Sequence, residues 1–358
     1  MSVFESVDFD HHETVAFFDD QNSGLKSIIA IHSTALGPAC GGCRMYPYLN
    51  EEAALTDVLR LSRGMSYKNA MADIPFGGGK AVVLGDPNKD KTEAKLLAFG
   101  RAVENLGGRY VTAMDVGMKQ ADLPIIARAT RYAAGYDQPG KTGGDSAPMT
   151  ALGVYLSLKA AVKHRLKTDQ LKGLTVAIQG LGKVGMRLAT QLHAEGAALV
   201  VADTNEAHVR QAENAYGAKV VAPGAIVTVE CDVLAPCALG AILDDVTVPL
   251  LKAKVIAGAA NNQLARDRHG AMLRERGVLY APDYVVNGGG VICVAGQILG
   301  WSDAEIETRT RAIAPTLARI FARADAENAP TNIIADRMAQ ERIARGAAPT
   351  PAKFAAAR

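Results

Sequence analysis

The sequence predicts a two-domain α/β protein, and three observations lead to this fold class. The chain has 358 residues, more than one ordinary domain holds. Apolar strand-like runs end repeatedly in glycine, proline or asparagine clusters, with helical periodicity between them. Residues 174–203 read as strand, glycine-rich turn, helix and second strand ending in an acid, typical of a Rossmann unit. We therefore expect an N-terminal α/β domain with a mostly parallel sheet, a Rossmann-type dinucleotide-binding domain and a cleft between them.

Composition narrows the functional classes. Apolar residues make up 49% of the chain, charged residues 21%, and the formal net charge is +2. This balance is typical of a soluble globular protein and argues against a nucleic-acid or membrane partner recruited by charge. No apolar run approaches the length of a membrane span, and the first residues lack the pattern of a signal peptide. We expect a cytoplasmic enzyme.

Residues 1–140 are expected to form the first domain, whose elements follow from periodicity. Strands and turns are predicted for residues 1–50, with His11 and His12 at the surface. The next predicted elements are a helix from Asn50 towards Gly64, a strand at 81–84, a helix at about 91–106 and a strand at 110–114. The first domain is thus predicted to mix strands and helices.

Two lysines and one aspartate stand out in this first domain. Lys68 and Lys80 lie among small and apolar residues, and lysine is rarely buried without a partner. The three glycines before Lys80 permit close approach of a ligand, although a glycine-rich loop with solvated lysines is the alternative. Asp115 follows the strand at 110–114, where ligand-facing residues collect in α/β domains; the alternative is a turn aspartate.

The cysteine pattern does not indicate a disulfide framework, because the count is odd and the spacing wide. The five cysteines are Cys40, Cys43, Cys231, Cys237 and Cys293. Cys40 and Cys43 form a C-x-x-C pair that could be redox-active or half of a zinc site, but no second ligand pair accompanies it. Two small apolar side chains in a pocket wall are the preferred interpretation, and no metal is expected.

The strongest local motif is the G-x-G-x-x-G formed by Gly180, Gly182 and Gly185. In a dinucleotide site these glycines permit the tight turn, admit the pyrophosphate and let helix and strand pack closely. The following helix directs its free N–H groups at the phosphates. Asp203, at the end of the second strand, can accept the ribose hydroxyls and would repel a 2′-phosphate, so NAD is expected rather than NADP. A strand–helix–strand unit without a ligand is the alternative.

The second domain is expected to cover residues 141–330, after a linker rich in glycine and proline at 135–146. A helix at about 149–164 leads into it. Its later strands are predicted at 231–235, 254–257 and 278–281, followed by a helix from Ser302 that Pro315 kinks or divides. Residues 331–358 are expected to form a C-terminal helix and tail that return to the first domain.

Read together, these motifs resemble the leucine, phenylalanine and valine dehydrogenase branch of the amino-acid dehydrogenase superfamily, in order along nearly the whole chain. The matching segments are 41–45 (GGCRM), 65–70 (MSYKNA), 77–80 (GGGK), 112–117 (TAMDVG), 180–185 (GLGKVG), 235–238 (APCA), 258–262 (GAANN) and 281–284 (APDY). The resemblance implies NAD-dependent, reversible oxidative deamination of an L-amino acid to a 2-oxo acid and ammonia.

The resemblance also implies roles for individual residues. Lys68 would bind the substrate carboxylate, Lys80 would be the general base for water, and Asp115 would exchange a proton with the amino nitrogen. Asn262 would position the substrate and the nicotinamide. The implied substrate pocket also contains Cys40, Gly41, Gly42, Met65, Ala113, Val291 and Val294. The implied cofactor site comprises Ser146, Thr150, Gly180, Leu181, Gly182, Lys183, Val184, Gly185, Asp203, Thr204, Cys237, Ala238, Ala260, Asn261 and Asn262.

The deamination reaction requires these residue types even without the family resemblance. An amino acid offers a carboxylate, an ammonium group and a hydride, so one cation, one carboxylate and one base are needed. A lysine serves as a base near neutral pH only when burial and a neighbouring cation lower its pKa. We expect Lys68 to be that neighbour of Lys80, in an apolar cleft lined by glycine.

The pocket composition favours an apolar substrate side chain. Glutamate-specific relatives carry a lysine where Cys40 stands and a hydroxyl where Val294 stands, and neither is present. An uncharged pocket cannot offset burial of a second carboxylate. Branched-chain members usually carry leucine at the position of Cys40 and threonine at that of Cys43, so a shorter side chain here could admit phenylalanine. Branched-chain substrates are favoured, with an aromatic amino-acid dehydrogenase as the alternative.

Two other functions fit the sequence less well. A 2-hydroxy-acid dehydrogenase needs a histidine–acid pair and a substrate arginine, and no such pattern surrounds the histidines. A non-catalytic NAD-sensing module would leave Lys68, Lys80 and Asp115 as solvated charges. The resemblance further implies a homo-oligomer, without fixing the number of subunits.

Overall fold

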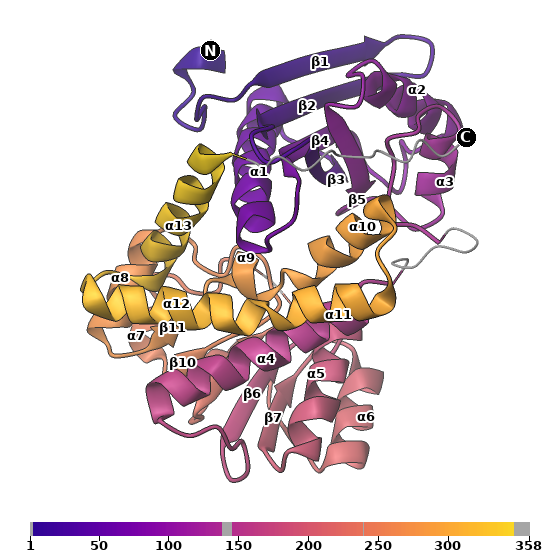
Figure 1. Ribbon diagram of the computed structural model, residues 1–358. Coiled ribbons are helices and arrows are strands. Elements are labelled where there is room, and N and C mark those ends of the chain that lie inside the picture. Colours follow the sequence, from indigo (N-terminus) through magenta and orange to yellow (C-terminus); the bar gives the residue numbers. More distant parts are fainter. Residues whose placement is uncertain (1–2, 138–144, 239, 347–358) are drawn as a thin grey trace. The chain divides into compact units, whose positions relative to one another are not determined.

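The computed structural model describes residues 3–137, 145–238 and 240–346 (Figure 1). The chain divides into two compact units: the first comprises residues 1–145, 291–305 and 339–358, and the second residues 146–290 and 306–338. The predicted two-domain α/β class is confirmed. Among the described helices, none is long and apolar enough to cross a membrane.

The first unit is built on a five-stranded sheet of order β1-β2-β4-β3-β5. The strands are β1 (Thr14–Asp20), β2 (Leu25–Ser33), β3 (Ala39–Tyr46), β4 (Gly77–Leu84) and β5 (Tyr110–Met114). Only β2 runs against the other four, because β1 and β4 both pair with it in antiparallel fashion while β3, β4 and β5 pair in parallel. The sheet is therefore mostly parallel, as predicted.

Helices cover both faces of this sheet. The helices are α1 (Glu51–Met71), α2 (Glu93–Glu104) and α3 (Asp122–Ala127), after a short 3-10 turn at Val3–Glu5. Helix α1 packs on one face through a small core that includes Val58, Leu59 and Val82. Helices α2 and α3 cover the other face, where a larger core includes Phe99 and Ile126. The alternation of side chains along each strand thus separates an α1 face from an α2–α3 face.

Helix α1 differs from its prediction because it continues through Gly64 to Met71. Asn50 caps its start, with the side-chain oxygen accepting from the Ala53 N–H at 2.8 Å. Near its end, Asn69 is fully buried, and its Nδ2 donates to the carbonyls of Gly77 at 2.7 Å and Cys40 at 3.3 Å. These tertiary bonds favour helix in a segment whose glycines and lysines read locally as a loop.

The second unit contains a six-stranded parallel sheet of order β11-β10-β9-β6-β7-β8. The strands are β6 (Thr175–Gln179), β7 (Ala198–Ala202), β8 (Lys219–Val220), β9 (Val233–Pro236), β10 (Val255–Ile256) and β11 (Leu279–Tyr280). The sheet order reverses on the two sides of β6, which is the topology of a Rossmann-type dinucleotide fold.

Helices flank this second sheet. They are α4 (Ala147–Leu166), α5 (Lys183–Ala194), α6 (Glu206–Tyr216), α7 (Thr247–Leu250), α8 (Arg268–Glu275), α9 (Asp283–Val286) and α12 (Ile313–Ala326), with a 3-10 helix at Pro223–Thr228. Helices α5 and α6 pack on β7, and α4 packs on α5 and α12. Helices α11 and α12 are separated at Ala312, so Pro315 lies in the first turn of α12, where proline is tolerated.

Each of the three remaining helices contains a sequence boundary between the two units. They are α10 (Gly289–Leu299), α11 (Asp303–Arg311) and α13 (Thr331–Arg345). Residues 291–305, which the sequence had assigned to the second domain, group with the first unit. The reason is specific bonding: Gln297 Oε1 accepts from the Gly135 N–H, and Gln297 Nε2 donates to the Tyr136 carbonyl, both at 2.6 Å. Most of the predicted linker lies outside the described residues.

Histidine 12 is buried rather than at the surface, and His11 alone is exposed as expected. The segment before β1 packs on α1, where the His12 Nε2–H donates to the Leu59 carbonyl at 3.1 Å. Its ring lies 4.9 Å from that of His32, centroid to centroid. Sequence spacing carries no signal for this contact, because it joins the N-terminus to the middle of a distant helix.

Candidate active site

Lys80 and Asp115 form a close ion pair on the α1 face of the first sheet. Lys80 lies in β4 with only 6% of its surface exposed, and Asp115 directly follows β5. Cys43 of β3 pairs with Ala81 on one side and Met114 on the other, which aligns Lys80 with the end of β5. The Lys80 Nζ lies 3.0 Å from the Asp115 Oδ2. Both predicted groups are thus brought together.

The immediate charged neighbour of Lys80 is therefore an anion, whereas the sequence suggested a second lysine. Lys68 lies near the C-terminal end of α1 and is half-buried. It is three residues from Met65, whose side chain lies against Gly41 of β3, so helical spacing places both on the side of α1 that faces the sheet. The two lysines share one face of the first unit, but the carboxylate of Asp115 contacts Lys80 directly.

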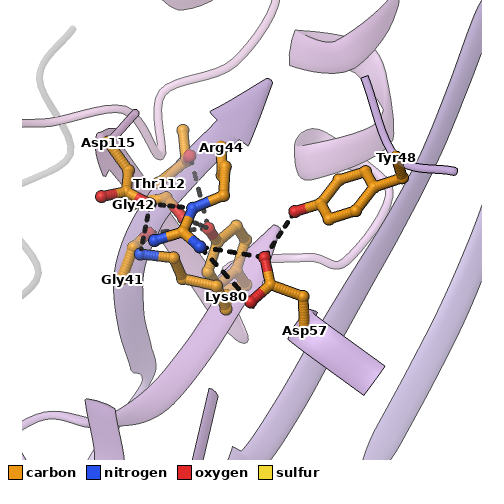
Figure 2. Close-up of polar contacts among 9 residues, drawn as sticks. Gly41, Gly42, Arg44, Tyr48, Asp57, Lys80, Thr112 and Asp115 are labelled. Atoms are coloured by element: carbon orange, nitrogen blue, oxygen red, sulfur yellow. Dashed lines mark hydrogen bonds and ion pairs between the residues drawn. The ribbon is translucent and has the colours of Figure 1, made fainter. Parts of the chain in front are cut away.

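Arg44 completes this cluster, and Figure 2 shows its side chain between two carboxylates. Its Nε donates to the Asp115 Oδ2 at 3.0 Å, and its Nη1 donates to the Asp57 Oδ2 of α1 at 2.9 Å. The Tyr48 hydroxyl donates to the same Asp57 oxygen at 2.5 Å. Arg44 lies within the segment 41–45, but its sequence context predicts no role for it, because its two partners are distant in the chain.

The cluster controls the ionisation of Asp115. Burial alone would raise the pKa of this carboxyl, but the positive charges of Lys80 and Arg44 outweigh it and hold the pKa below its ordinary value. Asp115 is therefore an anion at neutral pH and can accept a proton.

Two positions of β3 require glycine, because other parts of the chain lie in contact with its backbone there. A methyl group on Gly41 would collide with the Gly79 carbonyl and meet the Met65 side chain. A methyl group on Gly42 would lie 2.8 Å from the Asp115 Cβ. The absence of side chains at Gly41 and Gly42 therefore lets β3 pack closely against the backbone of β4 and against the segment that carries Asp115.

Gly135 belongs beside the predicted pocket residues Ala113 and Val294. It has φ +80°, and a methyl group built on it would touch the Ala113 Cβ and the Val294 Cγ2, each at 3.5 Å. Val291 and Val294 are one helical turn apart on α10 and share a face. Gly135 was predicted only as part of a linker. Its place in this wall depends on the amide of Gln297, which is distant in the chain and is not indicated by any local sequence signal.

Cys40 and Cys43 lie on opposite faces of β3, since they are three residues apart in a strand. Cys43 is in the core under α2, and both thiols are buried and free. Burial raises the pKa of Cys40 to about 12 and raises the pKa of Cys43 as well. They cannot form a disulfide with each other. The prediction that both line a pocket wall is wrong for Cys43, which lies in the core, and the pocket role of Cys40 stays a prediction.

The second unit contains the predicted glycine turn between β6 and α5. Gly180 has φ +92°, and a side chain there would come 2.6 Å from the Ala238 Cβ. Gly185 packs against the Gly180 carbonyl, so any side chain would separate α5 from β6. Nothing lies within 4 Å of the position a Gly182 side chain would occupy. The open space at Gly182, before the N-terminus of α5, fits a dinucleotide pyrophosphate.

Asp203 lies at the end of β7 and closes this turn. Its Oδ2 accepts from the Leu181 N–H at 2.5 Å, and its Oδ1 accepts from the Asn205 N–H at 2.7 Å. Partial burial would raise its pKa, but these N–H donors outweigh it and lower the pKa. An ionised carboxylate at this point fits ribose hydroxyls and disfavours a phosphate.

The remaining predicted cofactor residues gather at the carboxyl ends of β9 and β10 and at the start of α4. The Cys237 N–H donates to the Gln179 carbonyl of β6 at 2.7 Å, which ties the Cys237–Ala238 turn to the glycine turn. Asn261 accepts from the Asn287 Nδ2 at 2.8 Å, and Asn262 adopts φ +52°. A side chain on Gly290 would approach the Thr150 Oγ1 and Ser146 Oγ. The second unit thus gathers its predicted set around the switch point of the sheet.

Comparison with known proteins agrees with this geometry. The family model described as Glu/Leu/Phe/Val dehydrogenase, dimerisation domain, matches residues 11–132. The model described as Glutamate/Leucine/Phenylalanine/Valine dehydrogenase matches residues 143–214 and 197–347. Leucine dehydrogenase of Geobacillus stearothermophilus is 50% identical over 96% of this chain and 94% of its own.

Two further relatives show the same likeness. Valine dehydrogenase of Streptomyces albus is 49% identical over 94% of this chain and 93% of its own. The crystal structure of L-tryptophan dehydrogenase from Nostoc punctiforme superposes with a TM-score of 0.85 at 44% identity, covering 96% of this chain and 99% of that one.

Proposed function

The chain belongs to the Glu/Leu/Phe/Val dehydrogenase family, and from this we propose its reaction, substrate class and catalytic residues. It is an amino-acid dehydrogenase that catalyses reversible oxidative deamination of an apolar L-amino acid, with branched-chain substrates favoured, to a 2-oxo acid and ammonia. The observation that carries the residue assignments is the Lys80–Asp115 ion pair, in which the lysine is buried, since one amine and one carboxylate are the groups this chemistry needs.

A nicotinamide dinucleotide is the cofactor class of this family, and when bound it would supply a hydride acceptor for the substrate Cα–H. We propose NAD as the cofactor, held by the turn at Gly180, Gly182 and Gly185 and by the N-terminus of α5. Asp203 supports this choice, because its carboxylate is kept ionised by backbone N–H donors where a 2′-phosphate would lie.

Asp115 and Lys80 divide the proton transfers. The Asp115 carboxylate takes a proton from the substrate ammonium group, which leaves a neutral amine whose lone pair forms the C=N bond as the hydride departs. Lys80 in its neutral form removes a proton from a water molecule, whose oxygen bonds to the iminium carbon. Asp115 then returns its proton to the nitrogen, and the C–N bond breaks as the hydroxyl proton passes to the departing ammonia. The products are the 2-oxo acid and the ammonium ion, and Lys80 releases the proton that it took from water to the solvent. The reverse reaction uses the same groups in the opposite order.

Lys68 is proposed to bind the substrate carboxylate as a point charge. The side chain of the substrate is proposed to lie against the uncharged wall that includes Cys40, Ala113 and Val294. Cys40 is 6% exposed and Ala113 8%, so a second carboxylate placed there would lose its hydration without gaining a cation. This supports leucine and valine over glutamate.

An aromatic substrate is the second candidate. Two features favour it: the short side chain of Cys40, and the absence of a side chain at Gly135, where a methyl group would already touch Ala113 and Val294. One methylene of pocket space changes substrate preference by only about 1–3 kcal/mol, so this alternative concerns relative rates. The similar L-tryptophan dehydrogenase fits the same reasoning.

We also propose a homo-oligomer, because the model matched by residues 11–132 describes a dimerisation domain. The cytoplasmic location expected from the sequence stays a prediction.

The test is NADH formation at alkaline pH with leucine, valine, phenylalanine and glutamate, with Lys80→Ala assayed beside the wild type. We expect the highest kcat/KM for a branched-chain substrate and a loss of at least about 10²-fold in the variant, the low end for removal of a general base. A near-wild-type rate for Lys80→Ala would remove Lys80 from the mechanism. NAD binding without turnover of any amino acid would favour the non-catalytic sensor.

A further inference from the structure

Arg44 links the carboxylate that follows β5 to a carboxylate on α1. It extends from β3 and is 22% exposed, with its Nε on Asp115 and its Nη1 on Asp57. Asp57 in turn accepts a hydrogen bond from the Tyr48 hydroxyl (Figure 2). The carboxylate that binds Arg44 is therefore itself fixed by a hydrogen bond. A rigid guanidinium bound at two edges has little freedom to rotate.

The contacts fall on one oxygen of Asp115. Its Oδ2 accepts from the Lys80 Nζ and from the Arg44 Nε, each at 3.0 Å. In the part of the chain that the structure describes, no residue donates to its Oδ1. Two donors on the same oxygen fix the plane of the carboxylate and leave the other oxygen available to a ligand.

We propose that Arg44 is a positioning residue, which with Asp57 and Tyr48 turns Oδ1 of Asp115 towards the substrate nitrogen and keeps that carboxylate ionised. This inference rests on the proposed deamination, in which Asp115 exchanges a proton with the nitrogen. Arg44 itself forms no bond to the substrate in this scheme.

Charge supports this role. Around Asp115, several ionisable or charged groups influence its titration from the packed elements. They are Lys80 of β4, Arg44 and Cys43 of β3, Tyr110 of β5, and Tyr48 after β3. Asp57 of α1 lies on the other side of Arg44, from which it accepts a hydrogen bond. Burial raises the pKa of Asp115, and Lys80 and Arg44 are the cations that lower it. Without Arg44, Lys80 would have to balance burial alone.

A different explanation is that Arg44 merely braces β3 against α1. A brace and a positioning residue make different predictions about pH. Loss of a positive charge raises the pKa of an acid or base near it, whereas loss of a negative charge lowers it. Substitutions at Arg44 and Asp57 should therefore move the acidic limb of the pH profile in opposite directions, which loss of a mechanical brace would not do.

The experiment measures kcat and kcat/KM for deamination against pH in Arg44→Gln, Arg44→Lys and Asp57→Asn. We expect Arg44→Gln to lower kcat by about 10- to 100-fold, as for a slightly misplaced catalytic group. Its acidic limb should move up by about one pH unit, the low end for loss of an adjacent cation because both side chains are partly exposed. Arg44→Lys should restore the position of the limb but only part of kcat, because an ammonium group cannot span both carboxylates. Asp57→Asn should shift the limb to lower pH.

The matched control is Arg101→Gln, which removes the same charge from another ion pair of the first unit, with Asp20 at 2.9 Å and 57% exposure of the arginine. It should leave the profile unchanged, and NADH binding measured by fluorescence should be retained in every variant. Wild-type kcat and an unshifted limb in Arg44→Gln would overturn the proposal, as would shifts of the same sign in the Arg44→Gln and Asp57→Asn variants.

A second readout does not depend on turnover. Carbon-13 NMR of labelled aspartate carboxyls in the full-length protein follows the titration of Asp115 directly, assigned by its loss in Asp115→Asn. An upward shift in Arg44→Gln supports the electrostatic role, and an unchanged titration overturns it. If no amino acid is deaminated by the wild type, the proposed reaction fails while this measurement still decides whether Arg44 controls Asp115.

Discussion

Acidification should destabilise the first unit through His12, well before most carboxylates are protonated. His12 is 7% exposed, its Nε2–H donates to the Leu59 carbonyl, and its Nδ1 accepts from the Asp10 N–H at 3.3 Å. A second ring proton, added at Nδ1, would therefore face the Asp10 N–H, which is a donor and not an acceptor. Burial and the nearby His32 lower the pKa of His12 from 6.5 to about 4.

The direction and the size of the change in folding stability follow from this pKa shift. The unfolded chain binds the His12 proton more tightly than the folded protein, so unfolding takes up a proton between pH 6.5 and 4. Stability from this group is complete above pH 6.5 and declines as pH falls towards 4. At about 1.4 kcal/mol per unit, the loss over this window is roughly 3 kcal/mol. Burial also lowers the pKa of His32, so it adds to the same trend.

The assay is urea unfolding of the full-length protein at fixed concentration, from pH 4.5 to 7.5. His12→Gln keeps an amide donor and acceptor but cannot titrate, so its stability should depend less on pH than that of the wild type. The control His11→Asn removes the exposed neighbour, with asparagine chosen because His11 has φ +51°. The reasoning fails if His12→Gln keeps the full slope of the wild type. Loosening of α1, which carries Lys68, should accompany the loss of stability and can be followed by hydrogen exchange.

Three further substitutions test the other parts of the site. Asp203→Ser should raise kcat/KM with NADP relative to NAD, since it removes the anion facing a 2′-phosphate; an unchanged ratio would show that Asp203 does not select the cofactor. Gly182→Val should weaken NADH binding while leaving the unfolding midpoint near that of the wild type, because its side chain enters open space; fluorescence titration and urea unfolding measure the two effects. Gly41→Ala should lower stability by about 1–3 kcal/mol, the usual range for overpacking, because the new methyl group meets the Gly79 carbonyl; urea unfolding with an unchanged midpoint would contradict the close approach of β3 and β4.

Local signals account for the parts of the fold that the sequence predicted well. The strand β7 ends directly before Asp203 as predicted, and β5 covers 110–114 as predicted, since both are short apolar runs bounded by turn residues. In the glycine turn, Gly185 packs against the Gly180 carbonyl and Asp203 accepts from the Leu181 N–H, and both partners lie within one strand–helix–strand unit. Such a unit can be recognised from consecutive residues because its constraints are local.

Tertiary contacts decided the features that the sequence read differently. The last turns of α1 are helical because Asn69 bonds to the carbonyls of Gly77 and Cys40, which lie in other strands. His12 is buried by a helix that begins far from it in the chain. Gly135 lies in a pocket wall because Gln297 holds its backbone from α10.

The sequence by itself determined the fold class, the glycine turn with its acid, and the residue types of a deamination site. The reason is that the periodicity of strands and helices and the residue preferences of turns depend on residues that are close together in the chain. Only the tertiary structure decided that Asp115 lies 3.0 Å from Lys80 and shares an oxygen with Arg44. That geometry depends on the register of β3 between β4 and β5, and the pairing of strands is set by packing across the whole sheet. Charges that are distant in the chain acquire their ionisation and direction only when the sheet aligns them.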